Sequence, residues 1–432
     1  MSEQMLPLIT DFAPDAVFAL RGETAMTHAQ FLGQVRVLAQ RLPEGGYAIN
    51  LCEDRLAFSI AFCAAMLRGQ VNLLPNNVTP GALTELLLSY PGSYILSDKP
   101  NPVADAPYRA VVMDPSAPAQ PDAHVQLPAD QLAAIAFTSG TTGSPTGHPK
   151  DFGTLVAAAE LSRAMLAPHW ADLQIVATVP PQHMYGLEFT VFWPLVCGFT
   201  ANAAKPFFPA DLRDVLAATP KPRLLVTTPV HLRACFDAGV KFPDVQMIVS
   251  ATAPLPREWA KRAETLFKVA VTEIYGCTEG GSLASRRTAE TDIWTLHQGM
   301  AFSGDVVIAP HYPDPIELQD ELQAITGSTF RLSGRRGDMI KVGGKRTSMA
   351  ELTHKLLAVE GVLDGIVFMP DGGERPAALA VAPQLTDKQI LARLAGHVDP
   401  LFLPRPIRCV ERLPRDPSGK IAQSVLMELL RA

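Results

Sequence analysis

Apolar positions follow two alternating spacings along the first three quarters of the chain. Helical spacing recurs in four segments, which predict helices at 27–42, 57–67, 80–88 and 154–166. Short β-type runs lie between and after them and predict strands at 47–51, 71–74, 93–96, 133–137, 224–227, 245–250 and 269–274. Strands interleaved with helices are typical of α/β layers with largely parallel sheets. The pattern therefore predicts a layered α/β body.

Two stretches interrupt this alternation. Pro and Ala crowd residues 98–128, which we interpret as a surface connection. Residues 331–346 are rich in Gly and basic side chains and precede a predicted helix (350–359) and strand (365–369). A chain of 432 residues exceeds the ~250–300 at which single cores stop growing. We therefore expect a large domain at 1–336 and a small α+β domain at 337–432.

Composition and charge narrow the class of protein. With 47% hydrophobic and 19% charged residues, the chain is neither disordered nor fibrous. Its net charge of -6 lacks the excess of basic residues that is typical of nucleic-acid-binding proteins. Residues 331–432 carry 16 basic and 11 acidic side chains, a net +5, which leaves 21 against 32, or -11, for the rest. Either this surplus is chance, or the last quarter faces polyanionic ligands.

The cysteines and the apolar runs indicate a cytoplasmic protein. No CxxC pair occurs, so neither a zinc site nor a disulfide framework is suggested. The N-terminus is acidic and contains proline, unlike a signal peptide. Charges or prolines break the most apolar stretches, so we expect no membrane span.

The sharpest chemical signal lies between the strand at 133–137 and the helix at 154–166. This Gly/Ser/Thr loop begins Thr138, Ser139, Gly140, Thr141, Thr142, Gly143. A strand, such a loop and a helix together hold phosphate, because glycines let backbone N–H groups approach and hydroxyls add donors. A flexible linker would seldom interrupt a strand-to-helix junction. A kinase-type P-loop needs Lys after the last Gly, and here His148 follows Gly147.

The loop resembles the phosphate-binding signature [ST]SG[TS]TGxPKG of the adenylate-forming superfamily of acyl- and aryl-CoA synthetases, peptide-synthetase adenylation domains and luciferases. Thr146 occupies the place of the signature lysine, and Lys150 follows four residues later. Whether Lys150 takes over the missing lysine's role is open at this point. The resemblance implies the fold of that superfamily, a large N-terminal body of α/β subdomains with a small mobile C-terminal domain.

Two further segments of the body resemble superfamily motifs. Residues 274–279 are similar to YGxTE, which implies that Tyr275 after Ile274 stacks on adenine, with Gly276 beside it. Thr278 would meet phosphate and Glu279 would hold Mg²⁺, roles that suit a hydroxyl and a hard oxygen ligand. Residues 250–255 resemble the SGGAPL segment and place Ala251 beside adenine and the acyl group.

The C-terminal motifs supply the remaining implied roles. Residues 330–335 and 338–344 together resemble the hinge pattern GRxxDxIKxxGxR, with Gly337 as the hinge. By its interval before that pattern, Asp320 would bind the ribose hydroxyls, while Arg335 adds a ribose or phosphate contact. The similarity of residues 413–421 to PRxPxGKI implies that Lys420 is the mobile catalytic lysine. Rotation about the hinge would then bring the stretch from Lys341 to Lys345 to the site.

The segment 180–188 bears on the acid substrate. It resembles PLxHxxGL, in which His183 gates or lines the acyl pocket; a purely structural histidine is the alternative. Peptide-synthetase domains place an Asp near here for the substrate amine, and this segment offers none. An aryl acid or medium acyl chain therefore fits better than an amino acid. Several clustered side chains are candidates for the pocket or the core, namely Met184, Tyr185, Phe189, Phe192 and Trp193.

The resemblance as a whole implies an ATP- and Mg²⁺-dependent acid–thiol ligase. It would form an acyl-adenylate with release of pyrophosphate and pass the acyl group to CoA or to an acyl carrier protein. The compact length favours a carrier protein by analogy. A non-catalytic adenylate-binding homologue is the alternative from another class, and amino-acid adenylation is a further one. The basic side chains expected to face the ligands are Arg335, Lys341, Lys345, Arg346 and Lys420.

Overall fold

The computed structural model describes residues 4–432 apart from 76, 104–105, 115, 122–123, 139–145, 305, 336–338, 343–344, 374 and 416–420, and only the backbone within 333–346. The chain divides into two compact units. The N-terminal unit comprises Met1–Thr291, Leu296–Ala301 and Ile308–Ile316, and the C-terminal unit comprises Asp292–Thr295, Phe302–Val307 and Glu317–Ala432. The expected hinge, Gly337, lies outside the described residues, so the boundary at 336/337 stays a prediction.

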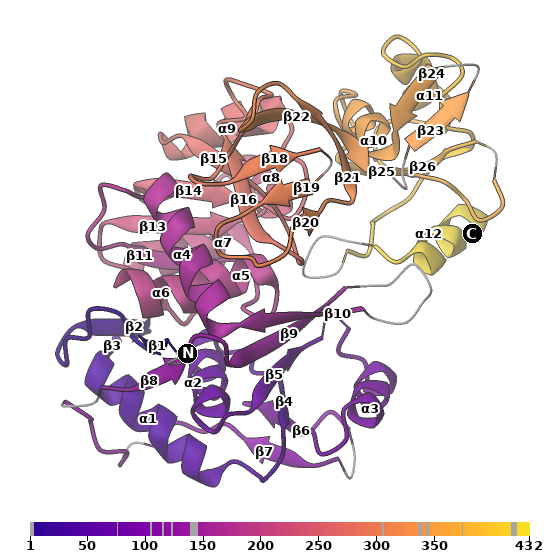
Figure 1. Ribbon diagram of the computed structural model, residues 1–432. Coiled ribbons are helices and arrows are strands. Elements are labelled where there is room, and N and C mark those ends of the chain that lie inside the picture. The colour runs from indigo at the N-terminus through magenta and orange to yellow at the C-terminus, as the bar shows by residue number, and fades with distance from the viewer. Residues whose placement is uncertain are drawn as a thin grey trace. The chain divides into compact units, whose positions relative to one another are not determined.

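The first sheet of the N-terminal unit has six strands in the order β10-β9-β5-β4-β6-β7 (Figure 1). Their bounds are β4 Tyr47–Asn50, β5 Val71–Leu74, β6 Tyr94–Ser97, β7 Tyr108–Ala110, β9 Leu132–Thr138 and β10 Thr146–Asp151. Neighbouring strands are parallel except for β10, which runs antiparallel to β9 at the edge.

A second sheet carries eight neighbouring strands of this unit in the order β16-β15-β14-β13-β11-β12-β2-β3. They are β2 Val17–Arg21, β3 Thr24–Thr27, β11 Gln174–Ala177, β12 Thr200–Asn202, β13 Arg223–Thr227, β14 Met247–Ser250, β15 Val271–Cys277 and β16 Gly281–Arg286. The strands from β15 to β2 are parallel, whereas β16 and β3 are antiparallel to their neighbours. The expectation of largely parallel sheets in an α/β body is thereby confirmed.

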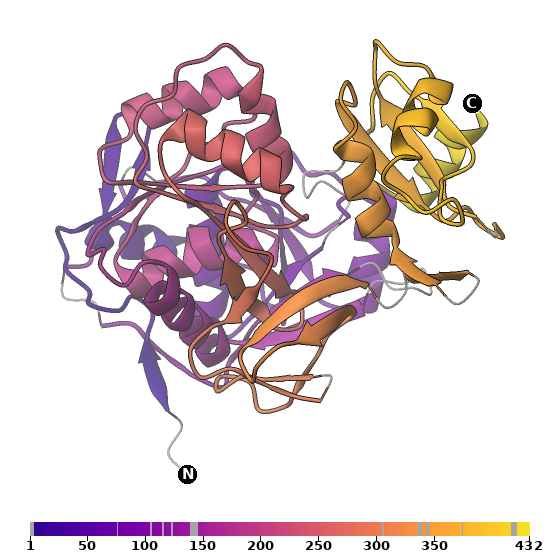
Figure 2. The ribbon, with the colours of Figure 1, turned by 90° about the horizontal axis from the view of Figure 1, so that it is seen from above.

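Helices cover and separate these sheets. Helix α2 (Arg55–Leu67) is buried along nearly its whole length and contacts β4 and β5 on one side and β12 on the other, so it lies between the sheets. The other helices of the unit are α1 His28–Arg41, α3 Pro80–Ser89, α4 Phe152–Leu166, α5 Met184–Leu187, the π-helical turn η1 Glu188–Phe192, α6 Trp193–Cys197, α7 Pro209–Ala218, α8 Pro229–Phe236 and α9 Arg257–Phe267. Figure 2 shows α7, α8 and α9 packed side by side.

Local sequence explains where two of the helices begin. Helix α1 starts after Thr27, whose hydroxyl accepts from the Gln30 N–H while the Gln30 side chain accepts from the Thr27 N–H. This capping box satisfies two N–H groups that the first turn leaves free. Asp54 caps α2 through the N–H of Ala57. Both starts lie within two residues of the sequence-based prediction.

Two stretches differ from the sequence-based prediction. The 98–128 connection contains β7, which pairs with β6, and ends in β8 (Gln126–Pro128), which pairs with β1 (Met5–Pro7). A strand, β10, also separates the phosphate-loop segment from helix α4, where we expected the helix directly. Its Gly147 and Pro149 hide the strand signature, and Pro is tolerated there because β10 is an edge strand.

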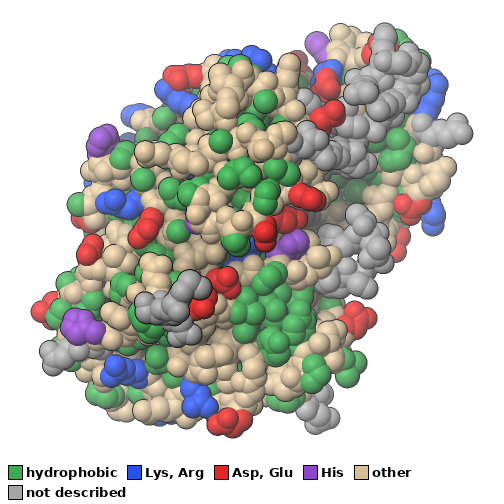
Figure 3. Space-filling view, in the orientation of Figure 1, with side chains coloured by type: hydrophobic (Ala, Val, Ile, Leu, Met, Phe, Trp, Pro, Cys, Tyr) green, Lys and Arg blue, Asp and Glu red, His purple; other side chains and the backbone are tan. Residues whose placement is uncertain are grey.

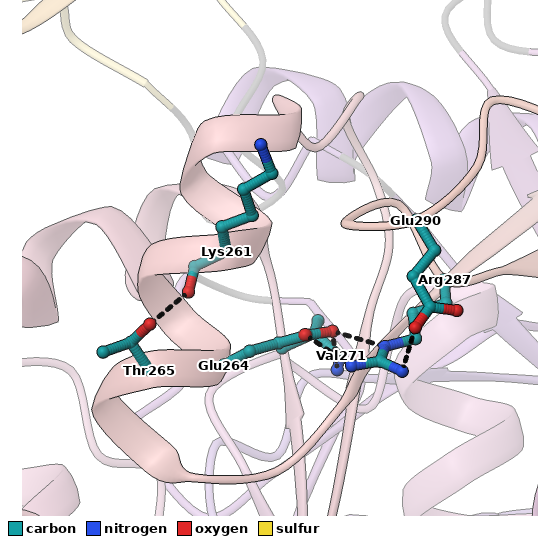
Figure 4. A network of polar contacts seen from close by, with 6 residues as sticks. All are labelled: Lys261, Glu264, Thr265, Val271, Arg287 and Glu290. Carbon is teal, nitrogen blue, oxygen red and sulfur yellow. Dashed lines mark hydrogen bonds and ion pairs between the residues drawn. The ribbon is translucent and has the colours of Figure 1, made fainter.

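A polar network anchors helix α9 to the strands beside it (Figure 4). Glu264 on α9 accepts from Arg287 Nε and Nη2 at 3.0 and 2.8 Å and from the Val271 N–H at 3.0 Å. Arg287 also pairs with Glu290. The start of β15 and the chain after β16 are therefore held by one helix side chain.

The C-terminal unit has its own hydrophobic core, formed by α10, α11, β25, β26 and the chain around residue 400. Its elements are β21 Asp320–Ala324, β22 Thr329–Arg335, β23 Met339–Val342, β24 Lys345–Ser348, α10 Met349–Leu357, β25 Asp364–Phe368, β26 Ala377–Val381, α11 Asp387–Leu394, β27 Ile407–Cys409 and α12 Gln423–Arg431. Four short strands span the borders between the units, namely β17 Trp294–Leu296, β18 Ala301–Ser303, β19 Val306–Ile308 and β20 Ile316–Glu317. The expected α+β composition of the last hundred residues is confirmed.

Three further observations concern the thiols, the length of the helices and the surface. All six cysteines are free thiols, namely Cys52, Cys63, Cys197, Cys235, Cys277 and Cys409. Among the described helices, none is long and apolar enough to cross a bilayer. Figure 3 shows hydrophobic side chains gathered on one face of the N-terminal unit over β5 and β9.

Candidate active site

The β9–β10 hairpin presents the phosphate-loop segment. Thr138, the last residue of β9, is paired directly with Thr146, the first residue of β10, so these two close the loop. The predicted phosphate ligands Ser139, Gly140, Thr141, Thr142 and Gly143 lie outside the described residues. Thr146, which occupies the place of the motif lysine, is exposed at the base of the loop.

The β15–β16 hairpin carries the predicted adenine and metal residues. Gly276 is paired with Ser282, and a Cβ on Gly276 would lie 2.2 Å from the Gly281 carbonyl oxygen, so only glycine fits. Tyr275 retains 8% of its surface exposed. Thr278 is half-buried, and the side chain of Glu279 is 31% exposed at the tip of the hairpin. Both Thr278 and Glu279 therefore remain accessible to a ligand.

Strand β10 places two side chains against Glu279. His148 Nε2 lies 2.9 Å from Thr138 Oγ1 and 3.9 Å from Glu279 Oε1. The Lys150 ammonium donates to the backbone carbonyl of Glu279 and, at 3.1 Å, to the Tyr312 hydroxyl. Burial lowers the pKa of Lys150 to about 8 and also lowers the pKa of His148. The end of the phosphate loop and the predicted metal ligand are thus brought together.

Sequence reasoning gave His148 no role and left the role of Lys150 open. His148 and Lys150 lie two residues apart and share one face of β10, but this became visible only with the strand itself, whose signature Gly147 and Pro149 hide. Lys150 is only 2% exposed. Its ammonium is directed toward Glu279 and Tyr312 in the interior of the N-terminal unit.

A third segment follows β14 and contains Ala251, which is buried and donates to the Thr227 carbonyl at 3.3 Å. Thr252 has φ +80°, a left-handed conformation that is strained for a β-branched residue. The motif that this segment resembles has a second glycine there. The backbone thus keeps a glycine-like turn although the side chain is threonine. Such strain clusters at functional sites.

A buried ion pair supports this segment from β15. Glu273 Oε1 accepts from the Leu255 N–H at 2.7 Å, and Oε2 pairs with Arg286 at 2.8 Å. Thr288 donates to the same carboxylate. Burial raises the pKa of Glu273, although Arg286 and Thr288 oppose that shift. The segment is thereby fixed to the hairpin that carries Glu279.

The acid-pocket segment places His183 immediately before helix α5, where its carbonyl accepts from the Leu187 N–H at 2.7 Å. Gly186 lies against the Pro180 carbonyl, which a Cβ would approach to 1.9 Å. Tyr185 is half-buried and donates to the Val249 carbonyl at 2.9 Å. Three of the clustered aromatic residues are fully buried and belong to the core, namely Phe189, Phe192 and Trp193. Met184 and Tyr185 remain as candidates for the pocket.

A buried carboxyl group follows in the π-helical turn η1, a kind of turn that is frequent at functional sites. Glu188 Oε2 accepts from the Ser282 hydroxyl at 2.7 Å, which joins η1 to β16. Burial raises the pKa of Glu188 to about 7, although hydroxyl groups nearby oppose the shift. In the sequence, Glu188 is only the last residue of the 180–188 motif.

Two histidines, His297 and His311, have buried ring nitrogens. His297 is 1% exposed, and neither it nor His311 has a hydrogen-bond partner for its ring nitrogens among the described residues. Burial lowers the pKa of each to about 4, so both are neutral near pH 7. Within the described part of the chain, no three His, Cys, Asp or Glu side chains are grouped so that they could hold a metal ion.

The C-terminal unit brings together two of the predicted ribose residues. Asp320 on β21 is paired directly with Arg335 on β22, although they are 15 positions apart in sequence. Lys341 on β23 is paired with Arg346 on β24. The side chains of Arg335, Lys341, Lys345 and Arg346 are not described, and Lys420 lies outside the described residues. Their predicted orientation toward the ligands stays a prediction.

Comparison with known proteins identifies the family. Residues 11–309 match the model of the AMP-binding enzyme family. A 4-coumarate–CoA ligase of Rhodobacter capsulatus is 30% identical over 62% of this chain and 67% of its own, and one of Halorhodospira halophila is 27% identical over 66% and 73%. The solved structure of O-succinylbenzoate coenzyme A synthetase from Bacillus subtilis, in complex with ATP and magnesium ion, superimposes with a TM-score of 0.81 at 18% identity, over 98% of this chain and 99% of that one.

The family match covers more than half of the chain and includes the phosphate loop, the 250–255 segment and the β15–β16 hairpin. The superposition extends the shared fold over nearly the whole length. The chain therefore belongs to the AMP-binding enzyme family and has the fold of the adenylate-forming superfamily.

Proposed function

We propose that the protein is an AMP-forming acid–CoA ligase that acts on an aryl carboxylic acid. It would join the acid to the α-phosphate of ATP, release pyrophosphate, and pass the acyl group from the adenylate to the CoA thiol. The observation that carries this proposal is the junction of Thr138, His148 and Glu279, where His148 Nε2 lies 2.9 Å from the Thr138 hydroxyl at the start of the phosphate loop and 3.9 Å from an accessible carboxylate.

The accessible carboxylate fits a magnesium ion. Mg²⁺ takes hard oxygen ligands and is often bound through one or two carboxylates together with substrate phosphates. Glu279 supplies such an oxygen at the tip of its hairpin, 31% exposed. When bound, Mg²⁺ would supply positive charge that screens the two reacting anions.

The chain's own residues would do the remaining work by binding and orientation. Thr138 and Thr278 offer hydroxyl donors to phosphate oxygens, and fixed donors of this kind stabilise charge that develops in the transition state. Tyr275 offers an aromatic face for adenine. By resemblance, Asp320 and Arg335 bind the ribose, and Lys420 bridges the carboxylate and phosphate oxygens. Positioning of both reactants suffices without a covalent enzyme intermediate.

The choice of an aryl acid rests on the acid-pocket segment and on the relatives. Met184 and Tyr185 are both half-buried, and the Tyr185 hydroxyl donates to the carbonyl of Val249 on β14, two residues before Ala251, so they offer polarizable and aromatic surface for an aryl group. No carboxylate stands in the motif ahead of Glu188 to hold a substrate amine, which supports an acid over an amino acid. The relatives named above carry the names of ligases for the aryl acids 4-coumarate and O-succinylbenzoate.

The acceptor is assigned to CoA because the relatives are named as CoA ligases. Nothing in the described structure favours the carrier protein that the compact length suggested. Transfer to a carrier protein is therefore an alternative outcome of the test below.

Pyrophosphate release tests the proposal directly. The protein is incubated with ATP and Mg²⁺ and a panel of aryl, medium-chain and amino acids, with CoA or a phosphopantetheinylated carrier protein added in parallel. We expect release with an aryl acid and an aryl-CoA product, and a loss of about 10²–10³-fold in kcat for Glu279→Ala because charge stabilisation is removed. Lys420→Ala should lose activity as well, whereas Lys388→Ala, an exposed lysine of α11, should not.

The outcomes distinguish the alternative substrates, the alternative acceptors and a non-catalytic protein. Turnover of an amino acid would overturn the aryl-acid assignment, and transfer only to the carrier protein would overturn the CoA assignment. No pyrophosphate release with any acid, together with unchanged ATP binding in Lys420→Ala, would favour a non-catalytic adenylate-binding protein.

A further inference from the structure

Lys150 is a buried cation whose partners lie on two other segments of the N-terminal unit. Its ammonium donates to the Glu279 carbonyl and to the Tyr312 hydroxyl at 3.1 Å, and it lies 4.9 Å from the centre of the Tyr312 ring. Taking an ammonium out of water costs several kcal/mol unless other groups solvate it. Here a carbonyl, a hydroxyl and an aromatic face take the place of water and stabilise the ammonium charge in the interior.

The geometry of β10 separates Lys150 from the phosphate loop. Thr146, His148 and Lys150 share one face of the strand, because side chains alternate with a period of two. At about 3.4 Å per residue, Lys150 lies roughly 14 Å along the strand from Thr146, the place of the motif lysine. Its ammonium is already engaged in the interior, at the backbone of the β15–β16 hairpin tip.

The same face of β10 holds Glu279 at two points. Lys150 binds its backbone carbonyl, while His148 lies 3.9 Å from its carboxylate and 2.9 Å from the Thr138 hydroxyl. Because β10 is also paired along its length with β9, which ends at Thr138, the loop and the carboxylate are held by one strand. A shift of β10 would move both together.

We propose that Lys150 is a positioning residue for Glu279, which it holds by the main chain so that the carboxylate stays at the end of the phosphate loop. This inference rests on the proposed function, in which Glu279 holds the metal ion. The missing lysine at Thr146 is then not replaced by a second phosphate contact. Lys150 acts indirectly, by positioning Glu279, the proposed metal ligand.

Nucleotide binding in the absence of any acid tests this role without relying on turnover. The dissociation constant of ATP is measured by calorimetry in EDTA and again with Mg²⁺, for the wild type and for Lys150→Met. Residues that orient a metal ligand typically contribute 10–100-fold to metal affinity. We expect the tightening of ATP binding by Mg²⁺ to fall by about that factor in Lys150→Met, while the value in EDTA stays unchanged.

Matched variants distinguish a positioning role from a folding defect and from a simple effect of charge near the loop. Tyr312→Phe removes one partner of the ammonium and should reduce the Mg²⁺ effect in the same direction by less, which answers the question even where Lys150→Met fails to fold. Lys261→Met changes an exposed lysine on α9 and should leave both constants unchanged. Thr146→Lys in the Lys150→Met background restores a lysine beside the loop and should not restore the Mg²⁺ effect.

Three results would overturn the inference. Weaker ATP binding of Lys150→Met in EDTA would mean a direct phosphate contact, and restoration by Thr146→Lys would mean that only charge near the loop matters. An unchanged Mg²⁺ effect in both Lys150→Met and Tyr312→Phe would remove the positioning role. If Mg²⁺ tightens ATP binding to the wild type through Lys150 but no acid yields pyrophosphate, the proposed function fails while the positioning role stands.

Discussion

The β15–β16 and β9–β10 hairpins place their polar residues by different means. In β15–β16, the motif glycine, tyrosine, threonine and glutamate all stand where the family pattern has them, and a buried carboxylate–guanidinium pair supports the hairpin. In β9–β10, the motif lysine is replaced by Thr146, and a buried lysine that donates hydrogen bonds to a carbonyl and a hydroxyl lies further along the strand. The comparison teaches that two neighbouring hairpins of this unit are held differently, one by a buried ion pair and the other by a buried ammonium with neutral hydrogen-bond partners.

The largest expected effect comes from breaking the ion pair that supports β15–β16. Arg286→Met leaves the Glu273 carboxylate, 3% exposed, without its cation. Removing one partner of a buried pair typically costs about 3–5 kcal/mol. We expect the free energy of unfolding, measured in urea by tryptophan fluorescence, to fall by that amount.

Two variants place this loss in context. Arg213→Met disrupts an exposed pair with Asp214 and should cost less than about 1 kcal/mol. Lys150→Met removes a buried cation whose hydrogen-bond partners are neutral, so the regained desolvation energy offsets part of the lost hydrogen bonds. Equal losses for Arg286→Met and Lys150→Met would contradict the distinction between the two hairpins.

A smaller effect concerns the pH dependence of stability through Glu188, which is hydrogen-bonded to β16. Its pKa is about 7 in the folded protein against 4.5 for an unburied group, so the folded state binds the proton more tightly. Stability from this group is fully present below pH 4.5 and is lost as the pH rises through about 7, by up to about 3 kcal/mol. Glu188→Gln keeps the shape without the ionisation and should flatten the curve between pH 5 and 8.

Urea unfolding at several pH values measures this difference. The exposed Glu85→Gln on α3 serves as the matched control and should leave the wild-type slope intact. A change in stability between pH 5 and 8 that is the same in the wild type, Glu188→Gln and Glu85→Gln would show that Glu188 does not keep its proton on folding.

The smallest effect tests the strained turn that Glu273 supports through Leu255. Thr252 has φ +80°, and relief of such strain is worth about 1 kcal/mol or more, partly offset by the greater freedom of glycine in the unfolded chain. Thr252→Gly should therefore raise stability by about 1 kcal/mol in the same urea assay. Thr252→Ala keeps a Cβ and hence the strain, so an equal gain in Thr252→Ala would show that the side chain, not the backbone, is responsible.

Much of the fold could be predicted because its signals are local. The helices α1, α2 and α3 and the strands β4, β5 and β6 appear within two residues of the prediction, since hydrophobic spacing and caps are properties of neighbouring residues. β10 could not be predicted in this way. A strand containing Gly147 and Pro149 exists because β9 offers it an edge to pair with, and that is a property of the sheet.

The sequence by itself determined the family and indicated the class of reaction and the candidate adenine and metal residues, because these depend on residue type in a fixed order. Only the tertiary structure decided that the Lys150 ammonium is buried at the Glu279 carbonyl, and that His148 stands between Thr138 and Glu279. Lys150 and Glu279 are 129 positions apart. Contacts of that kind arise when separate segments pack together, and they leave no periodic trace in the chain.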